Sequence, residues 1–126
     1  MQRLIAALLV VVGVIHLLPL SGVLGPARLG VLYGLAFDDP NLAILMRHRA
    51  VLFGLLGAFL VYAAFRPVLQ PLAFIAGFIS VGSFLWLAWS TPGYNASIGR
   101  VVAADWVALA CLLVATAAFF QGARRH

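Results

Sequence analysis

Four long apolar segments constrain the fold of this chain more than any other feature. They run through residues 4–24, 40–65, 72–89 and 101–120. Each carries about 20 mostly apolar residues, the length that an α-helix needs to cross the roughly 30 Å hydrocarbon core of a bilayer. Short connections make successive helices antiparallel. The sequence therefore predicts an all-α, integral-membrane, four-helix bundle of up-down-up-down topology, in one domain over residues 1–126.

The composition excludes the main alternatives to a membrane protein. Hydrophobic residues make up 65% of the chain, charged residues make up 9%, and the mean hydropathy is +1.13, unlike a water-soluble or a disordered chain. The single cysteine, Cys111, excludes a disulfide framework. The first segment also resembles a signal peptide, but no A-x-A cleavage site follows its long apolar run, so we expect it to remain as the first helix.

The clearest helix boundary precedes the second segment. Asp38 or Asp39 can cap the free N–H groups of a helix, and Pro40 suits the first helical position. A helix that begins there places residues 47–49 about 10 to 14 Å along its axis. We therefore expect these three basic side chains near the headgroup region and not at the bilayer centre.

All eight basic residues are arginine, and the net charge is +5. The arginines are scattered over loops and helix ends, so lipid headgroups are the expected anionic partners and nucleic acid is not. Four arginines fall on the side of the two termini and four on the opposite side: Arg3, Arg66, Arg124 and Arg125 against Arg28, Arg47, Arg49 and Arg100. Because two of the latter can lie within a helix, we expect both termini in the cytoplasm of a multi-pass inner-membrane protein. A dual topology is the alternative.

The alternating topology brings the rare polar side chains to one end of the bundle. The first and third segments end here, and the second and fourth segments begin here. The candidate ligand-binding residues there are His16, Arg47, His48, Ser83, Trp86, Arg100 and Asp105. Tyr33, Trp89, Tyr94 and Asn95 lie on the same face. Each also has a plainer interpretation, since aromatic residues form interfacial belts and a lone histidine is often bonded to a backbone carbonyl.

Helical phase separates two of the arginines. Arg47 shares a helix side with Ala50 and Gly54, whereas Arg49, about 200 degrees away, shares a side with Phe53. Small residues mark the sides on which membrane helices approach closely. We therefore expect Arg47 to point into the bundle and Arg49 to reach the headgroups.

Asp105 is the one acidic residue within a predicted span. An ionised carboxylate there costs several kcal/mol unless it finds a partner, and Arg47 or Arg100 is nearest by depth. Such a pair would be either a structural ion pair that fixes helix order or part of a ligand site. Both interpretations remain open.

Sequence motifs for hydrolases, metal sites and nucleotide binding are missing, so no catalytic or metal-ligating residue is assigned. His16 and His48 could ligate a haem from neighbouring helices, and His16, Asp105 and the tryptophans could bind a quinone. Either would make the protein a membrane redox subunit. Asp105 could instead serve proton-coupled transport, for which so small a chain would need an oligomer.

Several motifs resemble those of small proteobacterial four-helix membrane proteins: HLLPLSG at 16–22, LYG at 32–34, DDPN at 38–41, MRHRAVLFG at 46–54, AFRP at 64–67 and QP at 70–71. Members often carry the label phosphopantetheine adenylyltransferase. That enzyme is a soluble α/β protein with an HxGH motif, which cannot exist here because the histidines are His16, His48 and His126. The predicted arrangement of four helices also resembles that of DoxX-like proteins, some of which are linked with quinone-dependent oxidation.

The leading prediction is a non-enzymatic membrane protein. We expect a polar pocket in the outer leaflet that binds an anionic amphiphile or a partner protein. Arg47 would supply charge, and His16 and Asp105 would orient the ligand. Membrane lipids are the expected partners, with a homo-oligomer or a second membrane protein as further associations.

Overall fold

A computed structural model describes residues 1–36 and 38–124 and confirms the all-α class. The long helices are α1 (Gln2–Leu17), which continues into the 3-10 helix η1 (Leu18–Leu24), then α3 (Pro40–Ala64), α4 (Gln70–Ser90) and α5 (Ala96–Arg124). A short helix, α2 (Pro26–Tyr33), precedes α3, and a 3-10 turn, η2 (Pro67–Leu69), precedes α4. Arg125, one of the arginines on the side of the termini, and His126 lie outside the described residues.

Four helical segments are long and apolar enough to cross a membrane. They are Gln2–Leu24, Pro40–Ala64, Pro67–Ser90 and Ala96–Arg124, and they coincide with the four predicted spans to within a few residues at each end. By the length and composition of these helices, the chain is a membrane-spanning protein.

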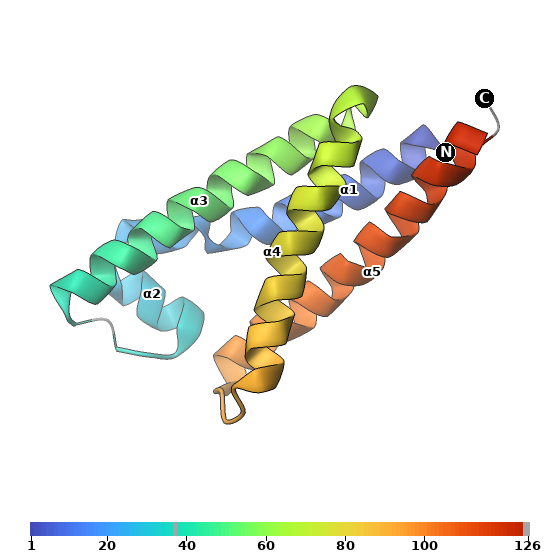
Figure 1. Cartoon of the computed structure of the whole chain (residues 1–126). Helices are drawn as coiled ribbons and strands as arrows, with labels where there is room; N and C mark the ends of the chain where they lie inside the picture. Colours follow the sequence, from blue (N-terminus) through green and yellow to red (C-terminus); the bar gives the residue numbers. More distant parts are fainter. Residues whose placement is uncertain (37, 125–126) are drawn as a thin grey trace.

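The long helices alternate in direction (Figure 1). α1 and α3 lie side by side, α4 crosses them, and α5 returns to the end of the molecule where both termini lie. Buried apolar side chains from all four long helices form one core, which includes Leu9, Leu60, Phe74 and Leu112. Toward the end that carries α2, the α1 and α3 pair diverges from the α4 and α5 pair (Figure 1).

Glycines bring α1 and α3 into close backbone contact. A Cβ atom added at Gly57 would lie 2.7 Å from the Gly13 carbonyl oxygen and 2.8 Å from Leu17, and one added at Gly13 would lie 2.9 Å from the Gly57 oxygen. Further along α3, a Cβ at Gly54 would meet Leu20 of η1 at 2.6 Å. This seam is a close helix-to-helix contact of the kind that small residues permit in membrane proteins.

The start of α3 follows the predicted capping pattern. The Asp39 side chain accepts a hydrogen bond from the backbone N–H of Asn41 at 2.9 Å, and Pro40 occupies the first turn. The short helix α2 differs from the expectation, because the sequence pattern predicts only a connection over residues 25–41. A signal was present, because Pro26 opens this helix and Gly34 ends it in the left-handed conformation with φ 66°.

Candidate ligand-binding site

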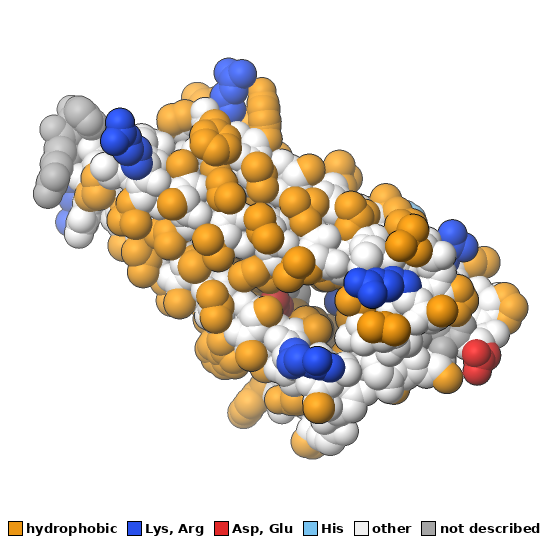
Figure 2. Space-filling view, turned by 180° about the vertical axis from the view of Figure 1, so that it is seen from behind, with side chains coloured by type: hydrophobic (Ala, Val, Ile, Leu, Met, Phe, Trp, Pro, Cys, Tyr) orange, Lys and Arg blue, Asp and Glu red, His pale blue; other side chains and the backbone are white. Residues whose placement is uncertain are grey.

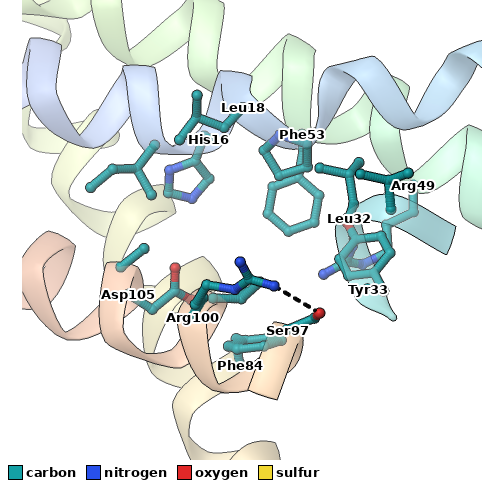
Figure 3. Close-up of a pocket in the computed structure, with 15 residues that line it drawn as sticks. His16, Leu18, Leu32, Tyr33, Arg49, Phe53, Phe84, Ser97, Arg100 and Asp105 are labelled. Atoms are coloured by element: carbon teal, nitrogen blue, oxygen red, sulfur yellow. Dashed lines mark hydrogen bonds between the residues drawn. The ribbon is translucent and has the colours of Figure 1, made fainter. Parts of the chain in front are cut away.

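A pocket of about 300 Å³ lies where the two helix pairs diverge. Most of its wall is apolar and comes from α1, η1, α2, α3, α4 and α5, with Phe53 and Phe84 as the largest side chains. The polar lining consists of His16, Tyr33, Arg49, Ser97, Arg100 and Asp105 (Figure 3). On the face drawn in Figure 2, a hollow opens among several arginine side chains. The pocket thus combines an apolar wall with two guanidinium groups and one carboxylate.

Arg49 of α3 is held in the pocket by aromatic side chains. Its Nη1 donates a hydrogen bond to the Tyr33 hydroxyl at 2.8 Å. The guanidinium carbon lies 4.4 Å from the centre of the Phe53 ring and 5.6 Å from that of Tyr33. Cation–π contacts of this kind stabilise a partly desolvated guanidinium and fix its position.

The structure reverses the directions expected for Arg47 and Arg49. Arg47 is exposed, does not line the pocket, and donates through Nε to the carbonyl oxygen of Val23 at 2.8 Å. The small residues in line with Arg47 pack directly against η1, where Gly54 meets Leu20. Small residues did mark the closest helix contact, but that contact is too tight to leave a pocket. The cavity instead lies on the other side of α3, where Arg49 and Phe53 line it.

Arg100 and Asp105 both enter the pocket from α5. Nη2 of Arg100 donates to the Ser97 hydroxyl at 3.0 Å. Within residues 1–36 and 38–124, Asp105 forms neither a hydrogen bond nor an ion pair. The expected pairing with Arg47 or Arg100 is therefore not present. Residues five apart on a helix point about 140 degrees from each other, so Arg100 reaches Ser97, one turn back, in place of Asp105.

His16 joins two helices and also lines the pocket. The side chain is 2% exposed, its Nδ1 donates to the carbonyl oxygen of Val12 at 2.9 Å, and its Nε2 lies 2.8 Å from the Ser80 hydroxyl of α4. Because a carbonyl oxygen can only accept, Nδ1 carries the proton, and Nε2 of the neutral ring accepts the proton of Ser80. The ring stands 5.7 Å from the Phe53 ring.

The two histidines suggested as haem ligands do not meet. Both nitrogens of His16 already have partners, and His48 is exposed and does not line the pocket. In the described part of the chain, no group of three or more His, Cys, Asp or Glu side chains could hold a metal ion. The haem interpretation therefore lacks the ligand geometry that it needs.

Two further sequence candidates point away from the pocket. Ser83 is exposed and donates to the Ser80 carbonyl oxygen in its own helix, and Trp86 is 63% exposed. Of the seven candidates, His16, Arg100 and Asp105 line the pocket, and Arg47, His48, Ser83 and Trp86 do not.

Sequence reasoning missed several pocket residues. Helical phase predicts Arg49 and Phe53 on the lipid side, and this prediction is wrong because both residues line the pocket. Phe84 and Ser97 carried no distinguishing signal, because a phenylalanine in a span and a serine near a helix start are common.

Asn95 fixes α2 beside the pocket. Its Nδ2 donates to the carbonyl oxygens of Tyr33, at 2.8 Å, and Gly34, at 3.4 Å, at the end of α2. Its Oδ1 accepts from the backbone N–H of Ile98 at 2.8 Å, which caps the start of α5. One side chain thus ties the helix that presents Tyr33 to the helix that presents Arg100 and Asp105.

The chain was compared with protein-family models, with curated proteins and with solved structures. None of the three comparisons gives a match. The geometry of the pocket is therefore the basis for assigning a function.

Proposed function

We propose that this protein binds a membrane amphiphile whose acidic head group is held by Arg49 and Arg100. The observation that carries the proposal is the pocket itself, in which these two guanidinium groups face an otherwise mostly apolar wall. Each guanidinium offers five N–H donors, and one donor of each is accounted for by Tyr33 or Ser97. Donors therefore remain for phosphate or carboxylate oxygens, which a planar guanidinium can bind in bidentate fashion.

The shape of the pocket favours an amphiphile over a small soluble anion. Its volume suits a head group, and two apolar residues of its lining, Leu18 and Val31, are 62% and 67% exposed. In a membrane-spanning protein, such exposed apolar side chains face lipid, so acyl chains attached to the bound head group can leave along them. A soluble anion would gain nothing from this surface.

The proposal includes a location. The resemblance to small proteobacterial four-helix membrane proteins supports the inner membrane. With both termini in the cytoplasm, the pocket lies in the outer leaflet. Membrane lipids are then the immediate partners, and a second copy or another membrane protein could dock at the same end.

Two arginines on α3 provide a matched test. Arg49→Gln removes the guanidinium from the pocket, whereas Arg47→Gln removes the same charge from an exposed position outside it. Hydrogen bonds to charged groups contribute about 1.5–3 kcal/mol, and each 1.4 kcal/mol is a tenfold change in affinity. We expect Arg49→Gln to weaken binding of phosphatidylglycerol at least about tenfold and Arg47→Gln to leave it unchanged, as measured by native mass spectrometry of detergent-purified protein.

The thermal unfolding of both variants serves as the control for folding. If Arg49→Gln and the wild type are both folded and retain the lipid equally, the pocket is not the lipid-binding site. Equal losses in the two arginine variants would instead indicate general attraction of headgroups to a basic surface.

A quinone is the second candidate ligand. Phe53 and Phe84 face the pocket, and the arginines could donate to quinone carbonyl oxygens. Organic extraction of the gently purified protein followed by mass spectrometry would reveal a stoichiometric quinone. Such a finding would favour a redox subunit over a lipid-binding protein.

A further inference from the structure

The polar lining of the pocket contains both signs of charge. Asp105 is half-buried in α5 and lines the same cavity as Arg49 and Arg100 (Figure 3). A carboxylate inside a membrane span is costly unless it is paired, and such residues mark functional sites in membrane proteins. No described residue donates a hydrogen bond to this carboxylate or lies within ion-pair distance of it, and the charge of Arg49 acts on it from further away.

The neighbouring polar groups are already committed elsewhere. Arg100 turns toward the Ser97 hydroxyl, and Arg49 is held by the Tyr33 hydroxyl and the face of Phe53. Both ring nitrogens of His16 are occupied, by Val12 and by Ser80. Among the described residues, none donates a hydrogen bond to the Asp105 carboxylate, so it can accept hydrogen bonds from a ligand.

We infer that the pocket is built for a zwitterionic head group, in which Arg49 and Arg100 bind a phosphate and Asp105 accepts hydrogen bonds from a primary ammonium. This inference rests on the proposed function and specifies its ligand as a phosphoethanolamine head group. The two charges of that group are joined by a short linker, and residues of both charges line one small cavity.

The aromatic residues favour a primary over a quaternary ammonium. A trimethylammonium group cannot donate hydrogen bonds and is usually recognised by the open faces of several aromatic rings. Here the Phe53 and Tyr33 rings already stack against the Arg49 guanidinium, at 4.4 Å and 5.6 Å. A carboxylate is the group that an ammonium with N–H donors requires.

Lipid selectivity provides the test. Purified protein is mixed with phosphatidylethanolamine, phosphatidylcholine and phosphatidylglycerol of identical acyl chains, and the bound fraction of each is measured by native mass spectrometry. We expect the wild type to bind phosphatidylethanolamine about tenfold more tightly than phosphatidylcholine. Asp105→Asn should abolish this preference and retain phosphatidylglycerol, which needs only the arginines.

Two variants control for folding and for charge. Asp38→Asn removes one negative charge at an exposed loop position outside the pocket, and its selectivity should equal that of the wild type. Asp105→Glu keeps the carboxylate and should retain a preference for the ethanolamine lipid over the choline lipid. A preference that persists in Asp105→Asn, or a wild type without any preference, would overturn the inference.

The outcomes separate this inference from the proposed function. If phosphatidylglycerol binding depends on Arg49 but no preference for the ethanolamine lipid exists, Asp105 does not bind an ammonium group. The proposed amphiphile site at the arginines is then unaffected. If no lipid depends on Arg49, both are wrong. Competition by free phosphoethanolamine distinguishes a lipid head group from a soluble ligand. If free phosphoethanolamine binds as tightly as the lipid, the head-group chemistry is supported but the ligand is soluble and not a lipid.

Discussion

His16 links α1 to α4 through a hydrogen bond with Ser80, so this histidine in an apolar span has a structural role. Both ring nitrogens are hydrogen-bonded inside the bundle, and the residue also lines the pocket. The expectation that a lone histidine bonds to a backbone carbonyl is therefore confirmed for Nδ1, which donates to Val12. The partner of Nε2 lies 64 positions along the chain and could not be identified from local spacing.

Ser80→Ala should destabilise the protein by leaving Nε2 of a buried histidine without its partner. Hydrogen bonds between membrane helices contribute about 0.6 kcal/mol on average and at most about 1.7 kcal/mol, so we expect a loss of about 1 kcal/mol in the free energy of unfolding. Denaturation in mixed detergent micelles measures it. Ser83→Ala is the matched control, because that exposed hydroxyl donates only within α4. Equal effects of the two substitutions would argue against the helix-to-helix bond.

The short helix α2 illustrates how one element depends on another. Pro26 and Gly34 delimit it, but so short a helix is not stable in isolation. Its position comes from the buried Leu29 and Tyr33 side chains and from Asn95, which binds the carbonyl groups at its end. The pocket wall formed by Tyr33 therefore relies on a side chain that precedes α5.

Two substitutions of Asn95 should separate its contacts. Asn95→Ala removes the cap of α5 and the bonds to α2, and we expect a loss of about 0.5–2 kcal/mol, the usual cost of a lost N-cap. Asn95→Asp keeps an oxygen that accepts from Ile98 but has no N–H for Tyr33 and Gly34. It should therefore preserve α5 while speeding hydrogen exchange in α2. Unchanged exchange in residues 29–34 of both variants would show that Asn95 does not hold α2.

Over the whole molecule, alternation of the four spans places the connections on two opposite membrane sides. The loop with Asp38 and the turn with Thr91 lie at one end of the bundle, and the turn with Val68 lies at the other. This separation follows from the number of crossings and does not depend on the arginine distribution, which is tied.

Cysteine labelling in intact cells checks this arrangement. In a Cys111→Ala background, a membrane-impermeant thiol reagent should label Asp38→Cys and Thr91→Cys from outside and should reach Val68→Cys only after the cells are opened. All three positions are exposed on the protein surface. Labelling of Val68→Cys together with the other two would contradict four crossings, and half-labelling of all three would show two orientations in one membrane.

Sequence alone was sufficient for the four long helices, though not for α2, and it brought three of the pocket residues to one end of the molecule. The apolar runs predict the spans because a bilayer demands a minimum length of uncharged helix. Asp39 and Pro40 predict the start of α3 because capping is a local interaction. His16, Arg100 and Asp105 were brought together by connectivity, since antiparallel helices join predictable ends.

Tertiary structure alone decided which side chains face the pocket. Arg47 and Arg49 lie two positions apart, and their directions depend on where α3 touches η1 and where it diverges from α5. In lipid, both sides of a helix can be apolar, so the sequence carries no hydrophobic contrast that marks the interior. Close packing of small residues closes one side of α3 against α1 and η1, and the cavity lies on the side that carries Arg49 and Phe53.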